Sequence, residues 1–424
     1  HQDSMGRCSF AALVHERLAH DPALMEMARI VQAADFRDQL DCHPAARGLA
    51  LISRGFPQVA EDDHQTVARA SFLYDALYAS IANPEGDRER GEGSEYNPLK
   101  ERTLTMYQEI APIQVRPWTL NGLSERLIVS HYENNYGGAV CTLNAVRQEL
   151  ATLDARTLGA RLRALKREEM LAMGSVTLHE LYFGNLGGEG NKIPDQARSM
   201  LEEHFGSVAV WRREFVAAAQ ALAGGSGWVM LTYSRGQKRL WNQIAIDSAQ
   251  AAVDAAPILV LDMDEHAYHL DFGANATAYI DAFMRNVAWA VVIERMTAVC
   301  AGRALPREDP SDTSLPSVSV EELAAQLAKG EPVQVLDARP RHHISRTVDL
   351  MEGATWRDPD RVEEWVGELS LEQPVAVYCA YGFHVGCNVT RMLRERGFDA
   401  RYVRGGVSAW YAVGGARAMR PPVG

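Results

Sequence analysis

The chain has 424 residues, of which 47% are hydrophobic and 23% charged, and its formal net charge is −12 at pH 7. This length exceeds what one domain core usually holds, so we expect several domains. No apolar run reaches the ~18 residues that a membrane-spanning helix needs. No dense Lys/Arg block is present, which argues against nucleic acid or an anionic membrane as the main partner.

The cysteine pattern indicates the compartment. Six cysteines are scattered along the chain without a CxxC pair: Cys8, Cys42, Cys141, Cys300, Cys379 and Cys387. Such a pattern favours a reducing compartment over a disulfide framework. The first residues, HQDSMGRCSF, lack a basic start followed by an apolar stretch, so we expect no secretory signal in this sequence. We therefore predict a cytoplasmic protein.

Two stretches rich in Pro, Gly, Ser and charge divide the chain: NPEGDRERGEGSEYNP and RALPREDPSDTSLPS. They predict domains over residues 1–82, 107–302 and 317–424, joined by linkers over 83–106 and 303–316. In the first domain, segments such as DPALMEMARIVQAADF have apolar residues at helical spacing. The first domain should be all-α.

The other two domains mix helices and strands. In the central domain, DARTLGARLRALKREEMLAMG predicts a helix, and the later runs GWVMLTYS, RLWNQIAI and PILVLDMD predict strands. This order is typical of an α+β fold. In the last domain, strand candidates such as VAVYCAYG alternate with the amphipathic helix NVTRMLRERGF. Such alternation predicts an α/β fold with a parallel sheet.

Four residues of the central domain are candidate metal ligands. Asp262 ends an apolar strand and His266 follows four residues later, a spacing at which a carboxylate and an imidazole can face one metal ion. His131 and His179 lie in the apolar helical contexts LIVSHYENNYGG and SVTLHELYFGNLGG. Taken alone, Asp262 and His266 are also typical of a helix cap with a partly exposed histidine. A lone histidine on an apolar face, such as His131 or His179, is more often a hydrogen-bonded core residue than a ligand.

In order and spacing, the segments HYENNYGG, HELYFGNLGG, GSGWVML and DMDEHAYHLDF resemble the iron/manganese superoxide dismutase family, over about residues 107–300. The resemblance implies a helical hairpin, a three-stranded antiparallel sheet and one Fe or Mn ion per chain. It makes His131, His179, Asp262 and His266 the metal ligands, with superoxide as the substrate. Three imidazoles and one carboxylate suit a redox-active first-row metal.

The resemblance also implies residues around the metal. Gln250 falls where the family has a side chain that hydrogen-bonds the metal-bound water, and a surface loop glutamine is the alternative. Ala139 stands at the position of the family's gateway tyrosine, with Tyr136 nearby as a replacement. Asp264 stands at the position of a family tryptophan.

Three further positions concern a dimer. The family residues at the positions of Asn135 and His269 form a hydrogen-bonded pair across the dimer interface, so we expect Asn135 and His269 to restore that pair. Glu265 matches a family glutamate that reaches across the dimer to a ligand histidine. A homodimer is therefore predicted.

In the last domain, the loop CAYGFH places Cys379 between a buried strand and a helix. Backbone N–H groups there would favour a thiolate or a bound anion, and a buried structural cysteine is the alternative. The span 317–424, with VLDARP and VRGGVSAW, resembles a single rhodanese domain, in which the loop cysteine carries a persulfide. His384 stands at the arginine position of that family's loop. We expect persulfide or sulfenate chemistry at Cys379.

The first domain, with CSFAALVHERLAHDPALMEMARIVQAADF, resembles the C-terminal part of chromate-resistance protein B over about residues 7–82. Together the three resemblances imply a cytoplasmic superoxide dismutase of chromate or oxidative-stress resistance, with an accessory thiol domain that uses a sulfur donor or acceptor. One alternative is a redox or chromate sensor or scaffold whose metal site does not dismute superoxide. The other is a chromate reductase that uses the metal or Cys379.

Overall fold

The computed structural model describes residues 8–17, 20–36, 107–153, 159–250, 252–306 and 314–420, with seven isolated positions between 46 and 81. The predicted linker 83–106 lies outside the described residues, and so do residues 307–313 of the second predicted linker. The chain forms two compact units, His1–Tyr96 and Asn97–Gly424.

The described part of the first unit is helical. Helix α1 spans Ser9–Arg17 and helix α2 spans Pro22–Asp35. Asp21 caps α2, because its Oδ1 accepts hydrogen bonds from the backbone N–H groups of Ala23 (2.9 Å) and Leu24 (3.1 Å). The apolar faces of the two helices pack together through Val14, Met27, Ala28, Ile30 and Val31. The expected all-α character is confirmed for these residues.

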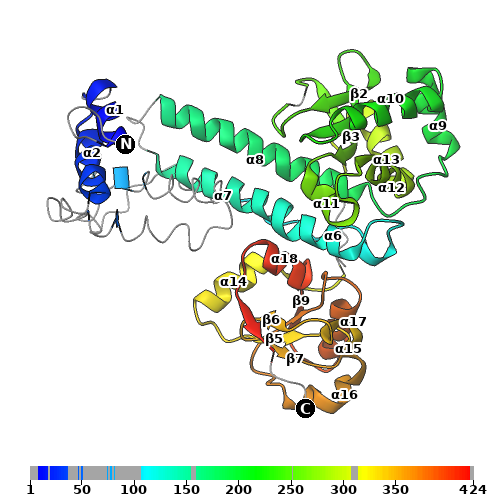
Figure 1. Cartoon of the computed structure of the whole chain (residues 1–424). Helices are drawn as coiled ribbons and strands as arrows, with labels where there is room; N and C mark the ends of the chain where they lie inside the picture. Colours follow the sequence, from blue (N-terminus) through cyan, green and yellow to red (C-terminus); the bar gives the residue numbers. More distant parts are fainter. Residues whose placement is uncertain are drawn as a thin grey trace. The chain divides into compact units, whose positions relative to one another are not determined.

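The second unit begins with a helical hairpin (Figure 1). One arm runs without interruption from α6 (Glu125–Ser130) through the π-helix η2 (His131–Tyr136) into α7 (Gly137–Thr152). The other arm is α8 (Ala160–Gly184), which packs along α7. Single π-helical turns inside α-helices occur frequently at functional sites.

A three-stranded antiparallel sheet follows the hairpin in the order β2-β1-β3. Strand β1 (Trp228–Ser234) lies between β2 (Arg239–Ala245) and β3 (Ala255–Asp262) and is buried along its whole length. Four helices of ten residues or more complete this central domain, and the strands and helices together confirm its expected α+β fold. These are α9 (Asp195–Phe205), α10 (Val208–Ala221), α12 (Ala276–Arg285) and α13 (Trp289–Cys300), and the short α11 (His269–Phe272) precedes α12.

The C-terminal domain contains a five-stranded parallel sheet, as expected, in the order β4-β9-β8-β5-β7. Its strands are β4 (Ser317–Val318), β5 (Gln334–Asp337), β7 (Thr355–Trp356), β8 (Val375–Tyr378) and β9 (Ala400–Val403). Strands β6 (Asp349–Met351) and β10 (Arg417–Met419) form an antiparallel pair. The helices are α14 (Val320–Ala328), α15 (Arg341–Ile344), α16 (Val362–Trp365), α17 (Val385–Glu395) and α18 (Gly406–Ala412).

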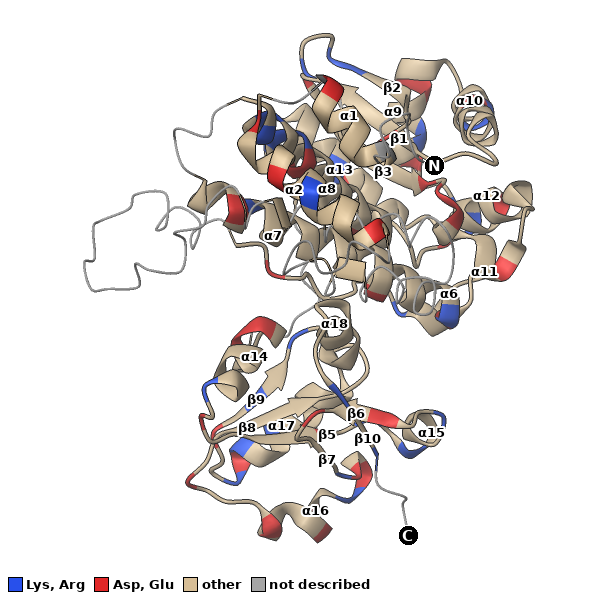
Figure 2. Ribbon diagram, turned by 60° about the vertical axis from the view of Figure 1, so that its left-hand side comes forward, with Lys and Arg blue, Asp and Glu red and all other residues tan. Residues whose placement is uncertain are grey.

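The central and C-terminal domains share one hydrophobic core, and α18 packs against the π-helix η2. Ser408 on α18 donates a hydrogen bond to the Glu133 carboxylate on η2 (2.8 Å). In Figure 2 acidic and basic residues are interspersed along the elements of both domains. Within the described ranges, no helix is both long enough and apolar enough to cross a bilayer.

Candidate metal centre

The four predicted ligands come together at one point of the central domain. His131, His179, Asp262 and His266 each present one donor atom, and these atoms all lie within 4.8 Å of one another. The Asp262 Oδ2 atom lies 3.1 Å from His131 Nε2, 3.2 Å from His266 Nε2 and 3.7 Å from His179 Nε2. Three imidazole nitrogens therefore surround one carboxylate oxygen.

Backbone geometry aims the carboxylate at the histidines. Asp262 is the last residue of β3, opposite Trp228 of β1. The backbone N–H of Asp264 donates to Asp262 Oδ1 (2.9 Å), which leaves Oδ2 for the imidazoles. The next residues form the short 3₁₀ turn Glu265–Ala267, and this turn brings His266 back over Asp262.

A similar constraint sets the tautomer of His179. The Nδ1 atom of His179 lies 2.8 Å from the backbone oxygen of Ser175, one turn earlier on α8. A proton on Nδ1 makes that hydrogen bond and leaves the Nε2 lone pair for the cluster. Nε2 of His179 is buried without a hydrogen-bond partner among the described residues. A metal ion at the centre of the cluster would supply that partner, so these side chains fit a metal.

The protonation states also fit a cation. Burial lowers the pKa of His131, and it lowers the pKa of His179 to about 3, so both imidazoles are neutral at pH 7. Burial alone would raise the pKa of the Asp262 carboxyl, but hydrogen bonds with His131 and His266 outweigh it and lower that pKa. His131 and His179 are therefore neutral nitrogen donors, and Asp262 is an anionic oxygen donor. Burial opposes the charge on His266, but its hydrogen bond with Asp262 outweighs burial and raises the pKa of His266.

An open cavity of about 380 Å³ adjoins His179 and His266. Asn135 and Ala139 line it, as expected for residues near the ligands. Sequence reasoning missed Ser175 and Ser248, which also line it. The position of Ser175, four residues before His179 on one helix face, could have revealed it. Ser248 lies in a loop and had no such signal.

Tyr136, the expected replacement for the gateway tyrosine, is not among the described residues that line this cavity. Its side chain is 1% exposed, and its hydroxyl donates to Glu180 Oε1 (3.0 Å) and accepts from the backbone N–H of Ala111 (2.9 Å). The Tyr136 ring lies 6.1 Å from the ring of His179, but its hydroxyl points to Ala111 and Glu180, whereas Asn135 lines the cavity.

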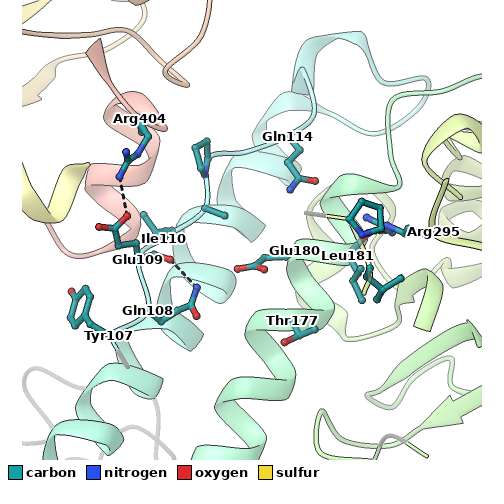
Figure 3. Close-up of a pocket in the computed structure, with 14 residues that line it drawn as sticks. Tyr107, Gln108, Glu109, Ile110, Gln114, Thr177, Glu180, Leu181, Arg295 and Arg404 are labelled. Carbon is teal, nitrogen blue, oxygen red and sulfur yellow. Dashed lines mark hydrogen bonds and ion pairs between the residues drawn. The ribbon is translucent and has the colours of Figure 1, made fainter. Parts of the chain in front are cut away.

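Glu180, which accepts the hydrogen bond from the Tyr136 hydroxyl, lines a different cavity of about 670 Å³ (Figure 3). Glu180 points into it from α8, and the ion pair between Arg404 and Glu109 (2.9 Å) lies at its other side. None of the candidate ligands lines this cavity.

Gln250, the expected hydrogen-bond partner of a metal-bound water, lies in the loop between β2 and β3. Its side-chain Oε1 accepts a hydrogen bond from the backbone N–H of Ile246 (3.0 Å), and its backbone oxygen accepts one from Gln243 (2.7 Å). These bonds close the loop after β2 and leave Gln250 exposed. It is not among the residues lining the metal-side cavity, which agrees with the loop-glutamine alternative.

Glu265 and His269 are exposed on the surface next to His266. Asn135 is half-buried. The pairing expected between Asn135 of one chain and His269 of another stays a prediction.

Cys379 directly follows β8 and is buried, with its thiol donating to the backbone oxygen of Phe383 (3.3 Å). Burial raises the pKa of the Cys379 thiol, although backbone N–H groups of the loop oppose that effect. Burial thus opposes the thiolate that the loop N–H groups favour, and persulfide or sulfenate chemistry at Cys379 stays a prediction. His384 has a positive φ of 54° and its Nε2 contacts the guanidinium of Arg116 in the central domain.

The fold and the cluster define a mononuclear site of three histidines and one aspartate beside a three-stranded sheet. Family models match three segments: iron/manganese superoxide dismutases, C-terminal domain (residues 194–295), ChrB, C-terminal domain (1–81), and rhodanese-like domain (319–413). The chain belongs to the iron/manganese superoxide dismutase family, with a ChrB-type and a rhodanese-like domain joined to it.

Curated relatives cover the central domain. A superoxide dismutase (Fe) of Cupriavidus metallidurans is 50% identical over 194 residues, which are 46% of this chain and 98% of the relative. A superoxide dismutase (Fe) of Aquifex pyrophilus is 34% identical, over 43% of this chain and 87% of the relative. A superoxide dismutase (Mn) of Haloferax volcanii is 32% identical, over 39% of this chain and 83% of the relative. The relatives thus include both iron and manganese proteins.

Proposed function

We propose that the chain dismutes superoxide at one Fe or Mn ion held by His131, His179, Asp262 and His266. The observation that carries the proposal is the convergence of these four donor atoms within 4.8 Å in a buried pocket. The bound ion would supply one-electron redox chemistry, in which two superoxide anions and two protons become O2 and H2O2.

The chain's own residues prepare that chemistry. Asp262 offsets part of the charge of the ion, and the bond to Ser175 holds His179 with Nε2 toward it. The cavity beside His179 and His266 gives a small anion a path from solvent to the ion. Polar side chains on its wall, among them Asn135 and Ser248, can hydrogen-bond an anion there.

Metal content and superoxide consumption, measured on one sample of each variant, test this proposal. His179→Ala and Asp262→Ala should both lose bound metal and activity. His204→Ala is the matched control, because His204 lies in the last turn of α9 and is not part of the cluster. Full metal content in both ligand variants would overturn the assignment.

We also propose that the protein acts in chromate or oxidative-stress resistance in the cytoplasm, as a homodimer through the central domain. The match of residues 1–81 to the ChrB C-terminal domain supports the chromate link. The described cysteines Cys8, Cys141, Cys300, Cys379 and Cys387 are free thiols, in keeping with a reducing compartment. Chromate tolerance of a sensitive strain should rise with the full chain and not with Asp262→Ala; equal tolerance with both would contradict this role.

The rhodanese-like match supports an accessory thiol function at Cys379. The second candidate function for the metal site is a sensor or scaffold. Ala139 stands at the gateway position, and the Tyr136 hydroxyl is bonded to Glu180, so no tyrosine is among the described residues that line the metal-side cavity. Bound metal without superoxide consumption would favour the sensor. Chromate consumption by the metal-loaded chain without added thiol would favour a reductase.

A further inference from the structure

Cys379 lies at a cavity of about 450 Å³ whose wall comes from two domains. The Cys379 loop contributes Tyr381, Phe383 and His384 from the rhodanese-like domain. The segment that leads into α6 contributes Trp118 and Glu125 from the dismutase domain. The volume lies in the range of pockets that hold small organic molecules.

Four contacts join the dismutase segment to the cysteine loop. The ring of Trp118 stacks on Tyr381 with centroids 5.7 Å apart and lies 6.3 Å from Phe383. The Tyr381 hydroxyl donates to Glu125 Oε1 at 2.6 Å. The fourth contact joins Arg116 to His384. The dismutase domain therefore completes the cysteine pocket.

The pocket wall is chemically divided. One side of the pocket is aromatic and consists of Trp118, Tyr381 and Phe383. Such a side favours contact with the carbon skeleton of an organic molecule over a small inorganic dianion. The exposed side chains of His342 and Arg346 line the outer part. An arginine there can bind a carboxylate with two hydrogen bonds.

Among the described residues, no arginine lines the inner part of the pocket next to Cys379. The loop carries His384 where a guanidinium would stand beside the thiol, and its Nε2 is engaged by Arg116. His343, which also lines the cavity, has its pKa lowered by burial and by the nearby Arg339, so it is neutral at pH 7. The surroundings of the thiol therefore do not favour a dianion such as thiosulfate.

We propose that this composite pocket binds a small organic persulfide that bears carboxylates, with Trp118 as the residue that sets specificity for the organic part. This inference rests on the proposed thiol function of Cys379. The donor R–S–SH gives its outer sulfur to Cys379. The S–S bond of the donor breaks, a new S–S bond forms at Cys379 Sγ, and the proton of the Cys379 thiol passes to the departing R–S⁻. The products are R–SH and the Cys379 persulfide, without an external oxidant or reductant.

The test uses the full metal-loaded chain and mass spectrometry of the Cys379 peptide, which gains the mass of one sulfur atom. The two donors are the persulfide of a carboxylate-bearing peptide thiol and thiosulfate, at equal concentrations. We expect the organic persulfide to modify Cys379 at least about tenfold faster. Trp118→Ala should slow the organic donor about tenfold, the upper range for loss of an aromatic contact, and leave thiosulfate unchanged. Trp241→Ala, at a half-buried tryptophan on β2, is the matched control and should change neither rate.

The outcomes separate two failures. Faster reaction with thiosulfate, or equal slowing of both donors by Trp118→Ala, would overturn the organic-persulfide pocket and leave the thiol function in place. No sulfur transfer from either donor to the wild-type chain would overturn the thiol function and this inference together. Neither result bears on the metal site, whose content is measured on the same sample.

Discussion

Tyr136→Phe separates a structural role for this tyrosine from a role at the metal. The hydroxyl is buried, and it joins the Ala111 amide (2.9 Å) to the Glu180 carboxylate (3.0 Å). Removing it leaves a backbone N–H without this acceptor and takes one donor from Glu180. A buried polar group that loses its partner costs about 1–3 kcal/mol. Glu180 is half-buried, and water can replace part of its loss, so we expect a destabilisation of about 2 kcal/mol.

For a domain of this size, about 2 kcal/mol lowers the Tm by roughly 4–8 °C. Calorimetry of the metal-loaded chain should show this shift in the transition of the dismutase domain, with superoxide consumption changed less than about twofold at 25 °C. Tyr107→Phe is the control, since the Tyr107 side chain is 55% exposed. An unchanged Tm together with a large fall in superoxide consumption would refute the structural role of Tyr136 and support a gateway role for it at the metal.

Three further changes test other parts of the account. Because burial raises the pKa of the Cys379 thiol, the rate at which Cys379 is alkylated should still rise with pH at pH 9, as its thiolate fraction does. A plateau of the alkylation rate below pH 8 would contradict this. Arg339→Met removes the ion-pair partner (2.7 Å) of the buried Asp337 carboxylate, so calorimetry should show a free energy of unfolding lower by about 3–5 kcal/mol. An unchanged Tm would show that this ion pair does not stabilise the domain. Gly137→Ala places a Cβ 2.3 Å from the Ala412 backbone oxygen, so amide hydrogen exchange in α18 should rise, and unchanged protection would show that the contact is dispensable.

The ligands could be predicted because each lies in a pattern that fixes its surroundings. An apolar strand that ends at Asp262 and a short 3₁₀ turn that begins at Glu265 define where Asp262 and His266 meet. The apolar spacing around His131 and His179 predicts helices, and the hairpin follows from them. The same spacing could not reveal the π-helix η2, since one widened turn changes few apolar positions.

The residues around the ligands were harder to predict, because one helical step or one loop conformation decides which way a side chain points. Asn135 and Tyr136 are neighbours in sequence, yet one lines the metal-side cavity and the other bonds Glu180. Gln250 folds back on Ile246, and Ser248 is the loop residue that lines the cavity and accepts the indole N–H of Trp228 (3.2 Å). Neither conformation follows from residue type alone.

Contacts between domains could not be predicted from sequence motifs, for a different reason. Trp118 lies more than 250 positions before the Cys379 loop that it stacks against, and nothing in its local sequence marks it as part of a thiol site. Such contacts depend on how two folded domains pack, which local periodicity does not encode.

The most direct test of the central claim is metal content by mass spectrometry, paired with superoxide consumption, on the wild-type chain as purified. We predict about one Fe or Mn ion per chain, held by the four-donor cluster found among the described residues, together with superoxide consumption. A chain without Fe or Mn that also fails to take up either ion on reconstitution would contradict the assignment of His131, His179, Asp262 and His266 as a dismutase centre.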